Sequence, residues 1–229
     1  MAANVAKIIE AAKKSGHRTL SEFDSKRIIA AYGIPVSRER LVGTLAEARN
    51  AAKRIKYPVV LKGCSADAAH KTEKGLVAVG LDSQNALSDA FAIIKKRAGK
   101  SYDGDYLVQE MVKGQREIML GMTRDAQFGP SVMFGLGGIF TEILQDVSFR
   151  VAPIHKRDAR QMLSEIRGHR ILDAIRGMKA VEKNILVDAI VALGKIGMDH
   201  PDIAEIDINP LIINGDKPVS VDALVVLGE

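Results

Sequence analysis

Polar and apolar residues alternate along residues 205–211, the segment EIDINPL. Side chains at every second position of a strand point to the same face, so Glu205, Asp207 and Asn209 are predicted to line one face. Three oxygen donors on one face are costly in a core unless a cation neutralises them, and such oxygens suit Mg²⁺. Asp222, on the next apolar segment, could supply a further ligand. The alternative is a sheet face in contact with water.

Helix and strand signals follow one another along the whole chain. Ser21 with Asp24, and Thr44 with Glu47, have the spacing of capping boxes that begin helices. The elements lack a regular βαβ rhythm, and neither GxGxxG nor GxxxxGK[ST] occurs, so the pattern predicts an α+β fold rather than a Rossmann sheet. The predicted helices are 1–16, 21–32, 44–56, 83–98, 157–166 and 179–197, and the predicted strands are 36–42, 59–62, 75–81, 106–111, 117–121, 130–134, 203–208 and 218–226.

Composition limits the classes of partner. The absence of Trp and the 4% of aromatic residues argue against a surface that stacks single-stranded nucleic acid. The net charge of +5 comes from 33 basic residues scattered among 28 acidic ones, which suits a small anion such as a nucleotide phosphate as well as it suits DNA. A single cysteine, Cys64, excludes an internal disulfide and fits a reducing cytoplasm. The sequence contains no run of about 18 apolar residues, so it predicts no membrane-spanning helix.

Two residues of the first half could carry phosphate chemistry. Lys62 ends the apolar segment VVLK, where a buried ammonium needs an anion, either a structural carboxylate or a phosphate. His70 lies in the loop CSADAAHKTEK, where Glu73 could orient one ring nitrogen. A neutral imidazole can accept a phosphoryl group at pH 7, although an ordinary surface histidine is the alternative.

A glycine-rich segment, GLGGIFTE at 135–142, lies in the second half. Gly137 and Gly138 would let backbone N–H groups approach an anion closely, and the alternative is a tight hairpin with a bulge. Arg150, in the nearby segment DVSFR, could grip a phosphate with its guanidinium group. The turn-rich residues 99–105 are the expected boundary, which gives an N-terminal helix at 1–19 and two parts at 20–104 and 105–229.

Taken together, the blocks VVLKGCS, SADAAHKTEKGLV, YLVQEMVKGQREIMLG, FGLGGIFTEILQDVSFR and AEIDINPL closely resemble the ATP-grasp domain of ADP-forming acetyl-CoA synthetases. The resemblance covers nearly all of residues 20–226. It implies an α+β ATP-grasp fold of two lobes with the nucleotide in the cleft between them. It also implies a free-standing β subunit, whose partner α subunit carries the CoA-binding and ligase domains, in a hetero-oligomer such as α2β2.

The same resemblance implies Mg²⁺ and ADP or ATP as cofactors and a role for each matched residue. After the HKTE block the family commonly has two glycines, whereas this chain has Gly75 and Leu76, so close backbone approach at residue 76 is in doubt. The implied roles are phosphate binding by Lys62, phosphorylation of His70, an adenine hinge at Glu110, Met111 and Val112, nucleotide contact by Glu117, Mg²⁺ ligation by Asn209 and Asp222, and a place near the metal and the incoming phosphohistidine for Asp207 and Glu205.

These roles imply that acyl-CoA, ADP and phosphate are converted to the acid, CoA and ATP, with His70 relaying the phosphoryl group. Two alternatives stay open. Another ATP-grasp carboxylate ligase that acts through an acyl phosphate would keep the lysine and the metal carboxylates but would not need His70. A regulatory module would bind the nucleotide without turnover. Detection of a phosphoenzyme, and acyl-CoA-dependent ATP synthesis with a larger subunit, distinguish the three.

Overall fold

The computed structural model describes residues 2–66, 75–99, 102–138 and 146–228. The chain divides into two compact units. The larger unit contains residues 1–20, 24–36 and 112–229, and the smaller unit contains residues 21–23 and 37–111. Helix α2 (Glu22–Ala31) therefore begins in the smaller unit and continues in the larger one.

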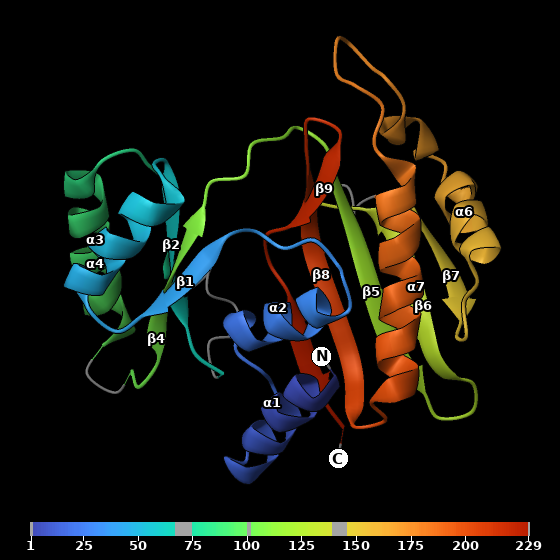
Figure 1. The fold of residues 1–229 in the computed structure, drawn as a ribbon, viewed down its shortest axis with the longest axis horizontal. Helices are drawn as coiled ribbons and strands as arrows, with labels where there is room; N and C mark the ends of the chain where they lie inside the picture. Colours follow the sequence, from blue (N-terminus) through green and yellow to red (C-terminus); the bar gives the residue numbers. More distant parts are fainter. Residues whose placement is uncertain (1, 67–74, 100–101, 139–145, 229) are drawn as a thin grey trace. The chain divides into compact units, whose positions relative to one another are not determined.

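The smaller unit is built on a four-stranded antiparallel sheet with the order β1-β4-β2-β3. Residues Val59 and Leu61 of the central strand β2 pack into an apolar cluster with helices α3 and α4, which lie together beside the sheet (Figure 1). Lys62 points to the opposite face by the alternation of the strand. The elements are β1 (Glu39–Val42), α3 (Leu45–Ile55), β2 (Val59–Cys64), β3 (Val77–Leu81), α4 (Gln84–Ala98) and β4 (Asp105–Glu110).

The larger unit is built on a six-stranded antiparallel sheet, in which β10-β8-β5-β6-β7 are neighbours and β9 pairs with β8. Helices α6 and α7 cover one face of this sheet (Figure 1). Its elements, besides most of α2, are α1 (Ala2–Lys14), β5 (Glu117–Asp125), β6 (Gly129–Leu136), β7 (Val147–Val151), α6 (Lys156–Glu165), the 3-10 helix η1 (His169–Leu172), α7 (Lys183–Asp199), β8 (Ile203–Asn214), β9 (Lys217–Ser220) and β10 (Leu224–Leu227).

The face under α7 is the apolar core of the larger unit. Met122, Val132 and Ile206 occupy one cross-strand row of β5, β6 and β8, and each is at most 1% exposed. A Cβ atom placed on Gly197 of α7 would lie 3.4 Å from the sulfur of Met122, so the helix passes directly over this row. Side chains of the intervening positions must therefore point to the other face.

The expected capping box of Thr44 and Glu47 is confirmed, whereas that of Ser21 and Asp24 stays a prediction. Thr44 caps α3, its side chain accepts from the backbone N–H of Glu47, and the Glu47 carboxylate accepts from the Thr44 N–H at 3.1 Å. Ser83 caps α4 as predicted. The Gly16 stop of the first helix has the positive φ of +73° that favours glycine.

Several expectations differ from the structure. The predicted strand 218–226 is in fact two strands, β9 and β10, and Asp222 lies between them. The division between units falls after Met111 and not at 104/105, because β4 pairs with both β1 and β2 of the smaller unit. Strand β7 was not predicted, since its five residues mix polar and apolar side chains. Helix α7 begins at Lys183 rather than 179, because the carbonyl of Lys179 accepts from the buried side chain of Arg116. In the part of the chain that the structure describes, no helix is long and apolar enough to cross a membrane.

Candidate functional site

The side chains of Glu205, Asp207 and Asn209 share one face of β8, as predicted, and are called the acidic row below. Ile206 and Ile208 are 1% and 0% exposed in the core, whereas Glu205 is exposed and Asp207 and Asn209 are half-buried. The alternation of the strand therefore turns the three oxygen-bearing side chains to the face opposite α7. This confirms the shared face that the sequence predicts.

Asp207 also has cross-strand neighbours on both sides in the sheet. Asp207 pairs with Leu224 of β10 on one side and with Gly121 of β5 on the other. Gly121 pairs with Met133 of β6, and Met133 pairs with Phe149 of β7. Phe149 is exposed, so the face opposite α7 offers an apolar side chain at its edge and the Asp207 carboxylate nearer its middle.

Asp222 lies beside the acidic row, as expected. The N–H of the preceding Val221 donates to the carbonyl of Pro210 at 3.2 Å, which holds this segment against β8 directly after Asn209. Burial, together with the negative charges of Glu205 and Asp222, raises the pKa of Asp207 to about 6. Three carboxylates thus interact electrostatically within one small region.

The donor set of this region suits one hard cation shared with a nucleotide. Within the described ranges, no group of three or more His, Cys, Asp or Glu side chains is arranged to enclose a metal by itself. Mg²⁺ commonly takes one or two carboxylates and completes its shell with water and phosphate oxygens. The carboxylate and amide oxygens here, and the repulsion that raises the pKa of Asp207, fit such a cation.

Glu117 begins β5 and shares the face of Gly121 by alternation. A Cβ on Gly138 would lie 2.5 Å from Oε2 of Glu117, so the two residues are in close contact. Gly137 donates its N–H to the carbonyl of Glu117 at 2.9 Å, so this amide already has an acceptor. Among the two glycines, Gly138, with φ +64°, keeps the positive-φ turn that the sequence suggests.

Arg150, which was expected to grip a phosphate, lies on the other face of the sheet from the acidic row. It pairs with Val132 of β6, whose side chain is in the core under the helices. Its guanidinium group donates to Glu165 of α6 at 2.6 Å. Because successive residues of a strand point to opposite faces, Phe149 takes the face opposite α7 and Arg150 the face that α7 covers.

In the smaller unit, Lys62 has a carboxylate partner. Its Nζ donates to Oε1 of Glu22 at 2.8 Å, and the two side chains are 8% and 0% exposed. The structural ion pair that the sequence left open is therefore present. Sequence analysis did not single out Glu22, since no spacing rule links two residues that are 40 positions apart. Phosphate binding by Lys62 stays a prediction.

The predicted adenine hinge, residues 110–112, is the segment in which the chain leaves the smaller unit and re-enters the larger one. Glu110 ends β4, and its carboxylate accepts from the backbone N–H and from Nε of Arg38 at 2.7 and 2.8 Å. The N–H of Met111 donates to the carbonyl of Pro58 at 3.3 Å. Val112, the first residue back in the larger unit, is 8% exposed. The side chain of Glu110 is thus committed to Arg38, which leaves backbone groups as the means of contacting a base.

His70 lies outside the described residues, so its surroundings stay a prediction from the sequence. Gly75, which follows that segment, has φ +64°, and its carbonyl accepts from Arg97 at 3.1 Å.

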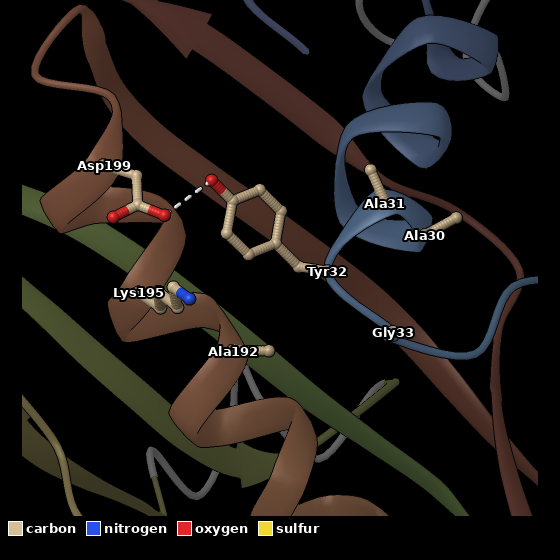
Figure 2. Close-up of a pocket in the computed structure, with 7 residues that line it drawn as sticks. All are labelled: Ala30, Ala31, Tyr32, Gly33, Ala192, Lys195 and Asp199. Atoms are coloured by element: carbon tan, nitrogen blue, oxygen red, sulfur yellow. Dashed lines mark hydrogen bonds between the residues drawn. The ribbon is translucent and has the colours of Figure 1, made fainter. Parts of the chain in front are cut away.

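A separate cavity of about 480 Å³ lies in the larger unit, between the end of α2 and α7 (Figure 2). The hydroxyl of Tyr32 donates to Asp199 at 2.8 Å across it, and burial with this hydrogen bond raises the pKa of Tyr32. Because α7 covers the apolar face of the sheet, this cavity and the acidic row are on different sides. Its lining residues are Ala30, Ala31, Tyr32, Gly33, Ala192, Lys195 and Asp199.

Comparison with known proteins agrees with this fold. A family model described as the ATP-grasp domain matches residues 11–227. The β subunit of ADP-forming acetate–CoA ligase I from Pyrococcus furiosus is 42% identical over 230 residues, which cover 98% of each chain. ADP-forming acetate–CoA ligase I from Archaeoglobus fulgidus is 39% identical over 97% of this chain, and the match spans 33% of that longer protein.

A solved structure of the dinucleotide-forming acetyl-coenzyme A synthetase 1 of Ca. Korarchaeum cryptofilum superimposes with a TM-score of 0.87 at 39% identity. The match covers 98% of this chain and 100% of that one. That protein was solved with coenzyme A and Mg-AMPPCP, with its phosphohistidine segment pointing towards the nucleotide binding site. From these matches and the fold, the chain belongs to the ATP-grasp family, among the β subunits of ADP-forming acetate–CoA ligases.

Proposed function

We propose that this chain is the nucleotide-binding β subunit of an ADP-forming acyl-CoA synthetase. With its partner subunit it would convert acyl-CoA, ADP and phosphate to the acid, CoA and ATP. Relatives of the same length carry the name of β subunits, and a longer relative contains the matching region as a third of one chain. The CoA-binding part then belongs to a partner α subunit, in a hetero-oligomer such as α2β2.

The observation that carries the proposal is the acidic row on the face of the larger sheet opposite α7. Burial, and then the charges of Glu205 and Asp222, raise the pKa of Asp207, and a cation bound among these carboxylates would offset their repulsion. Asn209 and Asp222 are the proposed protein ligands of Mg²⁺. When bound, Mg²⁺ supplies positive charge to the phosphate oxygens of the nucleotide.

The remaining groups would bind and orient the nucleotide. Lys62 offers an ammonium group to the phosphates, and the backbone of Glu110, Met111 and Val112 offers hydrogen-bonding groups to the adenine. Glu117, with the Gly137-Gly138 turn beside it, lies on the same sheet face as Asp207. Because phosphoryl transfer is largely positioning and charge neutralisation, these contacts account for most of the lowering of the barrier.

His70 would carry the phosphoryl group between the partner subunit and the nucleotide. In the step at this subunit, the P–N bond of phosphohistidine breaks and a P–O bond to the terminal phosphate of ADP forms. The ring takes up one proton from water as the phosphoryl group leaves, which gives a neutral imidazole and ATP. Glu205 and Asp207 are proposed to lie near the arriving phosphohistidine. The phosphohistidine segment of the Korarchaeum protein supports this role.

Phosphoenzyme formation tests the proposal directly. The complex of the chain with its partner is incubated with ATP labelled in the γ-phosphate and with Mg²⁺, and acid-labile label on this chain is measured. His70→Ala should abolish the label and keep nucleotide binding, whereas the control His17→Ala, at an exposed histidine, should label like the wild type. Undiminished label on His70→Ala would refute the relay. ATP turnover without any phosphoenzyme would indicate a carboxylate ligase instead.

The metal site has its own measurement. Calorimetric titration with Mg·ADP should show weaker binding for Asn209→Ala and for Asp222→Ala. Asp188→Asn is the control, since Asp188 is exposed on α7 and pairs with Lys156 at 2.7 Å. Unchanged affinity in both site variants would show that the metal is bound elsewhere.

A further inference from the structure

The ion pair between Glu22 and Lys62 is almost completely buried, with side chains that are 0% and 8% exposed. Strand β2, which carries Lys62, is buried at every position from Val59 to Cys64. Glu22 is 2% exposed and Lys62 is 7% exposed, and 2.8 Å separates Oε1 from Nζ. Removing two charges from water is expensive, so a folded chain keeps such a pair only where the charges compensate each other.

The carboxylate has a second reason to stay ionised. Glu22 is the first residue of α2, and the N-terminus of a helix favours a negative charge. The ammonium group of Lys62, on a flexible four-carbon stem, donates to Glu22 on the face of the smaller sheet opposite α3 and α4. Glu22 thus compensates the charge of the amine.

We propose that the Glu22 carboxylate competes with the nucleotide phosphate for Lys62. In the empty protein it is a counter-ion of Lys62, and its negative charge lowers nucleotide affinity. The inference rests on the proposed role of Lys62 in phosphate binding. A phosphate that approaches Lys62 meets a charge that is already compensated and a carboxylate that repels it. Glu22 is therefore a positioning residue that moderates how tightly ADP and ATP are held, which favours release of the product.

Thermodynamic linkage predicts that one substitution, Glu22→Gln, lowers stability and raises nucleotide affinity. Glu22→Gln keeps the size of the side chain and removes its charge, so the empty protein loses a negative charge beside the buried ammonium group of Lys62 and is destabilised. A bound phosphate restores a negative charge beside Lys62. The substitution therefore lowers the stability of the nucleotide-bound protein less than that of the empty protein. Nucleotide affinity must then increase by that difference. A purely structural residue would show the opposite, since a loosened site binds more weakly.

The experiment measures stability and affinity on the same variants. The full chain, purified with its partner subunit, is analysed by thermal unfolding and by calorimetric titration with Mg·ADP. Glu22→Gln should lower the unfolding temperature of the empty protein and tighten Mg·ADP by about fivefold or more, at the lower end of the usual coupling between two sites. The rise in unfolding temperature on adding Mg·ADP should exceed that of the wild type.

Two further variants complete a double-mutant cycle. Lys62→Met should weaken Mg·ADP binding, and Glu22→Gln combined with Lys62→Met should recover part of the lost stability while binding stays weak. Asp188→Asn, which breaks an exposed pair with Lys156, should change neither quantity. If Glu22→Gln does not fold, Glu22→Asp replaces it, because the shorter side chain moves the carboxylate away from Nζ and should tighten binding to a smaller degree.

The outcomes separate this inference from the proposed function. Tighter Mg·ADP binding together with a lower unfolding temperature in Glu22→Gln supports it. Unchanged or weaker binding in Glu22→Gln, or in Glu22→Asp where that variant is used, overturns the inference even if Lys62→Met binds poorly. Unchanged affinity in Lys62→Met removes Lys62 from the nucleotide site, and the inference with it, while the phosphoenzyme test of His70 remains independent.

Discussion

Asp207 and Arg150 lie on opposite faces of the same six-stranded sheet. Asp207 is in register with Gly121, which leads across the strands to the exposed Phe149, whereas Arg150 is in the next row with the buried Val132. One step along β7 thus decides whether a side chain faces the acidic row or the helices. The sheet assigns the carboxylates to the candidate site and excludes the guanidinium group from it.

Arg150→Ala should therefore leave Mg·ADP affinity within about twofold of the wild type, as expected for a residue without contact to the ligand. Its stability effect should be small, because the pair with Glu165 is partly exposed, at 28% and 37%. Calorimetric titration checks the affinity. A loss of tenfold or more would place Arg150 at the nucleotide after all, and a helix-facing guanidinium could not explain it.

Asp207→Asn should raise the stability of the metal-free protein at alkaline pH. Folding raises the pKa of Asp207 from 3.8 to about 6, so its stability contribution is complete below about pH 4 and is lost as the pH rises through 6. The difference of 2.2 units corresponds to about 3 kcal/mol above pH 7. Asparagine cannot ionise, so the variant and the wild type should be equally stable near pH 4, and the variant should be more stable at pH 8.

Urea unfolding in the presence of EDTA at the two pH values measures this difference. Added Mg²⁺ and ADP should stabilise the wild type more than the variant, because the cation compensates the carboxylates. A wild type that is more stable than Asp207→Asn at pH 8 without metal would contradict the electrostatic description of the site.

Arg116→Met should destabilise the larger unit by about 3 kcal/mol, since four carbonyl groups lose their donor. Arg116 is 4% exposed, and its guanidinium donates to the carbonyls of Ile171, Asp173, Lys179 and Gly215 at 2.8 to 3.1 Å. Arg116→Lys should be intermediate, because one ammonium group cannot reach all four acceptors. Hydrogen exchange should increase first at residues 171–181. A loss below about 1 kcal/mol in urea unfolding would show that water replaces the arginine.

Arg176→Asn should stabilise the protein by about 0.5 kcal/mol, because asparagine tolerates the left-handed backbone better than arginine. Arg176 has φ +49° and Gly177 has φ +81°, in a turn where Ile175 and Met178 exchange hydrogen bonds at 2.9 and 3.2 Å. Arg176→Val should be destabilising, since a β-branched residue fits this region poorly. Thermal unfolding of both variants gives the comparison. Equal stability of Asn and Val at this position would mean that the turn carries no backbone strain.

Much of the local structure could be predicted from the sequence because its causes are local. The Thr44 and Ser83 caps act over three residues, and the structure places both helices where these signals predict. The alternation from Glu205 to Asn209 acts over two residues and correctly predicts which side chains share a face. Asp222 was correctly placed beside β8, since the turn between β8 and β9 brings the chain back.

The sequence by itself determined the alternation of the acidic strand, the capped helices and the family to which the chain belongs, because each of these is written in short blocks of residues. Only the tertiary structure decided which distant groups meet. It pairs Lys62 with Glu22, turns Arg150 towards Glu165, and ends the smaller unit at Met111. Such pairings depend on strand register and on the path of the chain over tens of residues, and no periodicity or local spacing encodes them.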